Sequence, residues 1–249
     1  MRRLQSARSN QFKQKTDTIY VKISDKEIKC TIVRHSNRKS IKVLVNKGTV
    51  KVFVPSKASD KQIKSLLTQH GAKIYDILEK EVRQKEELIE KISLGEYYIA
   101  YLGKKIPVTS TESLEVPIRF EEHEIKINKR YIDYADVLLN RLLRKKAEEY
   151  IPERTKYIAY KNGFKFARVK IKDTKTRWGS CSSKGTISLN WRLIMAPVEV
   201  IDYVIIHELA HTVEMNHSKK FWEVVGRHFP NWKLCRDWLR KNGHNLSIP

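Results

Sequence analysis

The stretch from Pro197 to His211 constrains this chain more than any other part of it. It holds a dense run of apolar residues, namely Val200, Ile201, Val204, Ile205, Ile206, Leu209 and Ala210. These positions cover most of the circumference of a helix, which predicts a buried helix. Pro197 suits the first turn, so His207, Glu208 and His211 fall in the later turns. Burying two imidazoles and a carboxylate costs free energy unless they meet a partner such as a metal ion.

The spacing of the histidines predicts how such an ion would be held. His207 and His211 are four residues apart, so their imidazoles lie on one face of a helix and can reach the same ion. Glu208, beside that face, is predicted to be the general base that takes a proton from the attacking water. A catalytic zinc site has three protein ligands and an open fourth position. His217 is the candidate third ligand, with Asn216 as the left-handed residue that bends the chain back.

His217 also has an alternative interpretation, in which it only precedes Ser218 at the start of the next helix. Four further segments accompany the motif, namely Arg177 to Cys181, Leu189 to Leu193, Asn216 to Ser218, and Phe221 with Trp222. With them the chain resembles the YgjP-like family from about residue 18 onward. That resemblance implies a zinc metallopeptidase or other metal-dependent hydrolase, related to the SprT-like and WLM peptidases. It implies one Zn²⁺ per chain, or another divalent metal.

Other residues of these segments are candidates for binding substrate. Arg177, Trp178, Asn190 and Arg192 resemble family motif residues, and any of them could line the cleft or polarise a substrate oxygen. Hairpin packing and capping would explain the same residues equally well. Cys181 lies in a turn-like Gly-Ser-Cys-Ser setting, and a site of three histidines needs no thiolate, so we expect it to be structural.

The expected fold is α+β, with a zincin-like catalytic part at 131–249. In this part we expect a metal-binding helix to pack beside a small antiparallel sheet. A strand-rich N-terminal part with one long helix precedes it at 17–130, after a flexible basic tail at 1–16. We expect a hairpin at residues 41–54, turning at Asn46 to Gly48, and the helix from about residue 59 to 92. Strands are expected at 96–107, with a turn at Gly103, and at 118–127.

In the second half we expect a helix that Pro152 interrupts, followed by another helix that ends at Gly163. Two strands should follow, at 164–171 and 186–193. In zincins a strand beside the metal helix pairs with extended substrate, and the segment from Thr186 to Leu193 is the candidate.

The chain is strongly basic, with 50 Lys and Arg against 28 Asp and Glu and a net charge of +22. Such a charge favours polyanionic partners, and Arg168, Lys170 and Lys172 alternate with apolar residues as on one face of a strand. The charge could instead serve solubility alone. No apolar run approaches the ~18 to 20 residues of a membrane helix, and the N-terminus has no apolar block of signal-peptide type. We therefore expect no membrane partner and a cytoplasmic protein.

Three functions fit these observations. The first is a peptidase acting on peptide or protein substrates, with the basic face as a docking surface for nucleic acid. The second is a metal-dependent hydrolase of nucleotide phosphoanhydrides, of the UTP pyrophosphatase type; the lack of a Walker-type glycine loop counts against it. The third is a nucleic-acid-binding module with a structural zinc, which Glu208 and the lack of a fourth protein ligand disfavour.

Overall fold

The computed structural model describes residues 15–23, 26–46 and 48–248. The expected basic tail at 1–16 lies outside these residues except for its last two, with which the first strand begins. Two compact units divide the chain between Glu86 and Glu87. The expected domain boundary between residues 130 and 131 stays a prediction.

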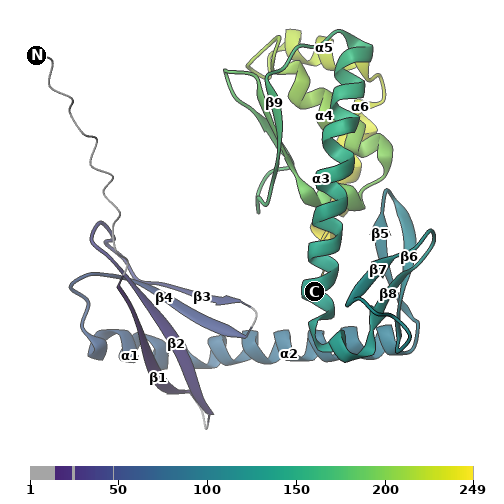
Figure 1. Ribbon diagram of the computed structural model, residues 1–249. Helices are drawn as coiled ribbons and strands as arrows, with labels where there is room; N and C mark the ends of the chain where they lie inside the picture. Colours follow the sequence, from purple (N-terminus) through teal and green to yellow (C-terminus); the bar gives the residue numbers. More distant parts are fainter. Residues whose placement is uncertain (1–14, 24–25, 47, 249) are drawn as a thin grey trace, which may run out of the picture. The chain divides into compact units, whose positions relative to one another are not determined.

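The first unit contains a mixed four-stranded sheet of order β1-β2-β4-β3 (Figure 1). Its strands are β1 (Lys15–Ile23), β2 (Lys26–His35), β3 (Lys42–Asn46) and β4 (Thr49–Pro55). β3 and β4 form the hairpin that the alternation of apolar residues predicted. Gly48 has the left-handed conformation that the turn requires. Val52, Val54 and Ile63 form part of the core of this unit.

Two helices follow where the sequence predicted one. Helix α1 (Asp60–Gln69) begins with a capping box, in which Ser59 and Gln62 each accept a hydrogen bond from the other's backbone N–H. Helix α2 (Gly71–Ser93) starts after a break at His70, where Gly71 has low helix propensity. Ile74 belongs to the first core, whereas Leu88 and Ile92 belong to the core of the second unit.

The second unit begins with a mixed sheet of order β5-β6-β8-β7. Its strands are β5 (Tyr97–Tyr101), β6 (Lys104–Thr111), β7 (Ile118–Phe120) and β8 (Ile125–Asn128). The expected turn at Gly103 is confirmed, because Leu102 and Gly103 both have positive φ. The single strand predicted at 118–127 is instead the hairpin of β7 and β8. The Leu102 N–H bonds to the Ile194 carbonyl (2.7 Å), which anchors the β5–β6 turn.

Helix α3 (Ala135–Asn162) follows η1 (Lys129–Tyr134) and runs the length of the second unit (Figure 1). The prediction that Pro152 would end a helix is wrong, since Pro152 lies inside α3. Buried residues on both sides of it, among them Ala147 and Ile151 before and Ile158 after, keep the helix packed through the position without an N–H. The predicted end is confirmed, with Gly163 at φ 72° as the left-handed cap.

The rest of the chain builds a second, three-stranded sheet and three helices. The elements are β9 (Arg168–Lys172), β10 (Gly179–Cys181), β11 (Thr186–Asn190), η2 (Trp191–Met195), α4 (Val198–Ala210), α5 (Lys219–His228), α6 (Trp232–Asn242) and η3 (Gly243–Asn245). β11 pairs antiparallel with β10 and parallel with β9, so the small sheet that we expected to be antiparallel is mixed. The segment expected to be a connection supplies β10, and β11 therefore runs in the same direction as β9. The molecule is thus α+β. Within the described part of the chain, no helix is both long and apolar enough to cross a membrane.

Candidate metal centre

Three imidazoles converge at the C-terminal end of α4. His207 lies in its last turn, His211 caps it, and His217 lies in the connection to α5. One ligand atom from each lies within 4.8 Å of the others, and Nε2 of His207 is 3.1 Å from Nε2 of His217. Among the residues that the structure describes, this cluster includes no fourth His, Cys, Asp or Glu.

The protonation of these imidazoles suits a cation. Burial, with the neighbouring His211 and His217, lowers the pKa of His207 to about 4. Burial also lowers the pKa of His211. Both rings are therefore neutral at pH 7, as metal ligands must be. Nδ1 of His207 is buried without a hydrogen-bond partner. The donor set fits a divalent metal with one position left open.

The segment between His211 and His217 holds these rings without the bend we expected. Asn216 does not have positive φ, because Leu102 is the only described residue other than glycine that does. The chain turns through backbone hydrogen bonds instead, including Val213 N–H to the Ala210 carbonyl (3.0 Å). Nδ1 of His211 lies 3.2 Å from the Glu214 carbonyl. A carbonyl only accepts, so Nδ1 carries the proton and Nε2 is left to bind an ion.

Aromatic residues of α5 form a wall of the site. The Phe221 ring, which is fully buried, lies 4.9, 4.4 and 4.8 Å from the rings of His207, His211 and His217. Trp222 stacks against His217 at 5.9 Å. Ser218 caps α5 by accepting a hydrogen bond from the Phe221 N–H. This cap fixes where α5 begins and so places both rings beside the histidines.

Glu208 lies against the first residue of β10. Glu208 as a residue is 5% exposed, and its Oε2 is buried without a hydrogen-bond partner. Burial raises the pKa of Glu208 to about 8, and the nearby Arg177 opposes that shift. A Cβ atom on Gly179 would lie 2.6 Å from Cγ and 2.7 Å from Cδ of Glu208. Only glycine at position 179 leaves this space for the carboxylate. Gly179 was not singled out from the sequence, since the close approach joins residues far apart in the chain.

The strand expected to pair with substrate is not free to do so. β11 lies between β10 and β9, so both of its edges are already hydrogen-bonded. Pairing of substrate with the segment from Thr186 to Leu193 is therefore excluded by the sheet order. The outer strand beside α4 is β10, which the sequence had suggested to be a connection. β10 has only 3 residues, which is too short for a hydrophobic pattern to reveal it.

The four candidate substrate-binding residues fall into two pairs. The side chain of Asn190 is occupied, since Nδ2 donates to the carbonyls of Thr174 (2.7 Å) and Arg177 (3.2 Å) and Oδ1 accepts from the Arg192 N–H (3.1 Å). Arg192 forms an ion pair with Asp173 and lies 4.7 Å over the Trp191 ring. Arg177 and Trp178 line hollows beside Gly179 and Glu208, and neither side chain is held by an ion pair among the described residues. Asn190 thus holds the backbone that presents Arg177.

Cys181 lies in β10 with its side chain partly buried. Burial and the nearby Glu208 raise the pKa of its thiol. A protonated thiol is neither a nucleophile nor a metal ligand. Cys181 is also no member of the histidine cluster in the described chain.

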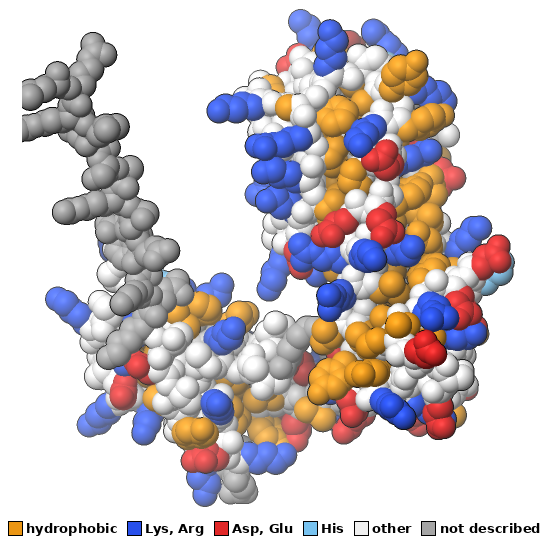
Figure 2. All heavy atoms as spheres, in the orientation of Figure 1, with side chains coloured by type: hydrophobic (Ala, Val, Ile, Leu, Met, Phe, Trp, Pro, Cys, Tyr) orange, Lys and Arg blue, Asp and Glu red, His pale blue; other side chains and the backbone are white. Residues whose placement is uncertain are grey.

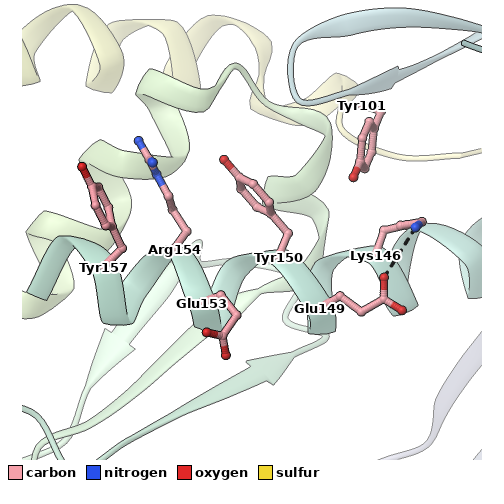
Figure 3. Close-up of a pocket in the computed structure, with 7 residues that line it drawn as sticks. All are labelled: Tyr101, Lys146, Glu149, Tyr150, Glu153, Arg154 and Tyr157. Atoms are coloured by element: carbon pink, nitrogen blue, oxygen red, sulfur yellow. Dashed lines mark ion pairs between the residues drawn. The ribbon is translucent and has the colours of Figure 1, made fainter. Parts of the chain in front are cut away.

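An ion pair connects α4 to α3. Arg154 donates two hydrogen bonds to Asp202, Nε to Oδ1 at 2.8 Å and Nη2 to Oδ2 at 2.6 Å. Figure 3 shows Arg154 between Tyr150 and Tyr157 on α3. These side chains line a hollow of about 460 Å³. None of the three histidines lines that hollow. Asp202 precedes His207 by little more than one helical turn, so the pair fixes the helix that carries the site.

A helix-borne histidine cluster beside a buried carboxylate is typical of metal-dependent hydrolases. A family model described as YgjP-like, metallopeptidase domain, matches residues 39–242. The chain therefore belongs to the YgjP-like family and is a metal-dependent hydrolase.

Two solved structures of metallopeptidase zymogens are also similar to part of the chain. Abylysin from Pyrococcus abyssi is 29% identical with a TM-score of 0.33, over 35% of this chain and 89% of that one. Jannalysin from Methanocaldococcus jannaschii is 24% identical with a TM-score of 0.30, over 34% of this chain and 90% of that one. No match is found among curated proteins.

Proposed function

We propose that this chain is a zinc-dependent peptidase, in which His207, His211 and His217 hold the ion and Glu208 is the general base. The observation that carries the proposal is the convergence of the three imidazoles beside a buried carboxylate oxygen without a partner. A bound Zn²⁺ would acidify a water molecule and polarise the carbonyl of the scissile bond.

The residues of the chain then have distinct tasks. Glu208 accepts the proton of the attacking water and delivers it to the nitrogen of the leaving amine. The charge of a cation nearby would lower its pKa and keep it able to accept that proton. β10 is the outer strand beside Glu208, and we propose that extended substrate pairs with it. Trp178 and the buried wall of Phe221 limit the access of water.

Glu208→Gln tests the base directly. Glutamine keeps the shape of the side chain but accepts no proton, so we expect metal content to stay at about one ion per chain while peptide cleavage is lost. Metal analysis of the purified protein and a peptide assay measure the two effects. Cleavage that survives in the variant would exclude Glu208 as the base. Wild-type protein that binds no metal even when excess metal is supplied would exclude the metal site.

The second candidate activity, hydrolysis of nucleotide phosphoanhydrides, is supported by the cations that line the hollows near Glu208. Assays of the wild type and of Glu208→Gln with nucleoside triphosphates distinguish this activity from the peptidase. Phosphate release that is lost in Glu208→Gln would favour the nucleotide, whereas release that persists would indicate a contaminant. A structural zinc in a nucleic-acid-binding module predicts no turnover of either substrate.

A further inference from the structure

Three hollows that share lining residues lie around the segment that contains Trp178 and Gly179. The first, of about 340 Å³, is lined by His207 and Glu208 together with Trp178 and Gly179. The second, of about 300 Å³, shares Gly179 with the first. The third, of about 360 Å³, shares Trp178 with the first and Arg177 and Asn190 with the second. We refer to these three hollows together as the depression; the first of them is the one that Glu208 lines.

The charge in this depression has one sign. Its permanently cationic lining residues are Lys172, Lys175, Arg177, Arg192, Arg236 and Arg240. Glu208 is the only acidic residue among the described residues that line it. Asp173 pairs with Arg192, and Asp237 lies 3.6 Å from Arg240. The other four cations have no ion-pair partner among the residues that the structure describes.

Among the four cations without an ion-pair partner in the described chain, Arg236 is the one that aromatic rings hold in place. It lies on α6, and its guanidinium is 5.0 Å from the centre of the Trp232 ring and 5.8 Å from that of Trp222. The two indoles stack at 4.3 Å, and Trp222 in turn stacks against His217. A guanidinium held over two aromatic faces loses less conformational freedom when it binds a carboxylate. Arg236 is therefore prepared to meet an anion close to the histidine cluster.

We propose that this depression selects peptide substrates with aspartate or glutamate side chains close to the scissile bond, and that Arg236 determines this preference. The inference rests on the proposed peptidase function and adds the class of substrate. Unpaired cations along the depression repel basic peptides and form charge-assisted hydrogen bonds with carboxylates. They are spread over three hollows, which suits side chains spaced along an extended peptide better than the compact phosphates of a nucleotide.

Matched peptides test the preference. A set of peptides of equal length would carry Glu, Gln or Lys at each position on either side of the cleaved bond. For the wild type we expect kcat/KM to be about tenfold higher with Glu than with Gln at the position that meets Arg236, and lower still with Lys. Arg236→Gln should abolish this ratio. Lys241→Gln, which removes an exposed cation of α6 outside the three hollows, should preserve it.

Binding of the same peptides to the metal-loaded Glu208→Gln chain gives a second readout. Fluorescence anisotropy should show the same order of affinity, again lost when Arg236→Gln is added. Equal cleavage of the Glu and Gln peptides by the wild type would overturn the inference and leave the peptidase function standing. Cleavage of no peptide by the metal-loaded wild type would instead overturn the function. Displacement of the Glu peptides only by nucleoside triphosphates would assign the cations to phosphate and overturn the inference.

Discussion

Gly179 is the residue that lets Glu208 occupy its position. The carboxylate side chain fills the space that a Cβ atom would take, with 2.6 Å left to Cγ. No ordinary contact between carbon atoms is so short, so a larger residue there must displace one of the two. The backbone of β10 is held by its pairing with β11, so the side chain of Glu208 is the part that would move.

We therefore expect Gly179→Ala to keep its metal and lose most of its activity. Displacement of a catalytic group by about 1 Å can lower the rate about 100-fold. Gly226→Ala is the matched control, because a Cβ there would come no closer than 3.6 Å to another atom. Peptide assays and metal analysis of both variants measure the effects. Full activity of Gly179→Ala would show that this close approach has no role in catalysis.

The sequence was sufficient to predict the residues of the site that neighbour one another along the chain. His207, Glu208 and His211 follow from their spacing on one helix, and the structure brings the two histidines together with His217. Arg236 and Gly179 had no comparable signal, because α6 and β10 reach the site only through tertiary packing. The roles of all these residues stay predictions until the variants are measured.

Among the elements, α3 and α4 depend on each other through Arg154 and Asp202. The Asp202 side chain is 16% exposed and the Arg154 side chain 31%, so the pair is largely shielded from water. Removing one partner from such a pair leaves the other charge without compensation. The geometry is bidentate, which strengthens the interaction.

Arg154→Ala should lower the free energy of unfolding by about 1 to 3 kcal/mol. The matched control is Arg144→Ala, also on α3, whose partner Glu148 is four residues away and about half exposed. That change should cost about 0.5 kcal/mol or less. Urea denaturation measures both. Equal effects of the two variants would show that the Arg154 pair adds no more stability than an exposed one.

Elements with a local signal were predicted well, and the failures have physical causes. The hairpin of β3 and β4 and the cap at Gly163 follow from short-range patterns. Pro152 remains helical because the buried face of α3 outweighs the missing hydrogen bond. The order of β9, β10 and β11 depends on pairing between distant segments, and no periodicity within a strand encodes it.

At the scale of the whole molecule, the net charge of +22 is partly concentrated on β9. Arg168, Lys170 and Lys172 are exposed, and they have no acidic partner within 4 Å in the part of the chain that the structure describes. Figure 2 shows Lys and Arg side chains gathered over the sheet that contains β9. Nucleic acid as a second partner stays a prediction, and these cations are its basis.

Retention on duplex DNA tests that partner. We expect binding to weaken as salt rises, because each contact with a phosphate releases a counterion. Arg168→Gln combined with Lys170→Gln should reduce the slope of log affinity against log salt by about two. Lys61→Gln combined with Lys64→Gln, which removes two exposed cations of α1, should change it less. If the protein is not retained on DNA at low salt, the positive charge serves solubility and not binding to nucleic acid.

The short distance between His207 and His217 affects how freely the chain between them can move. An ion bound by both would close a ring of about ten residues, as a cross-link does, and would restrict the motion of the start of α5. The N-terminal end of α5 otherwise depends on the cap from Ser218 and on the packing of Phe221.

Chelation should therefore accelerate amide hydrogen exchange in the first turn of α5 more than in the middle of α4, which is buried on most of its surface. Mass spectrometry of the metal-loaded and metal-free protein measures both helices in one experiment. Equal acceleration in the two helices would show that the ring adds no local restraint. Greater acceleration in α5 than in α4 would show that the bound ion restrains the start of α5 and holds the His217 imidazole close to those of His207 and His211.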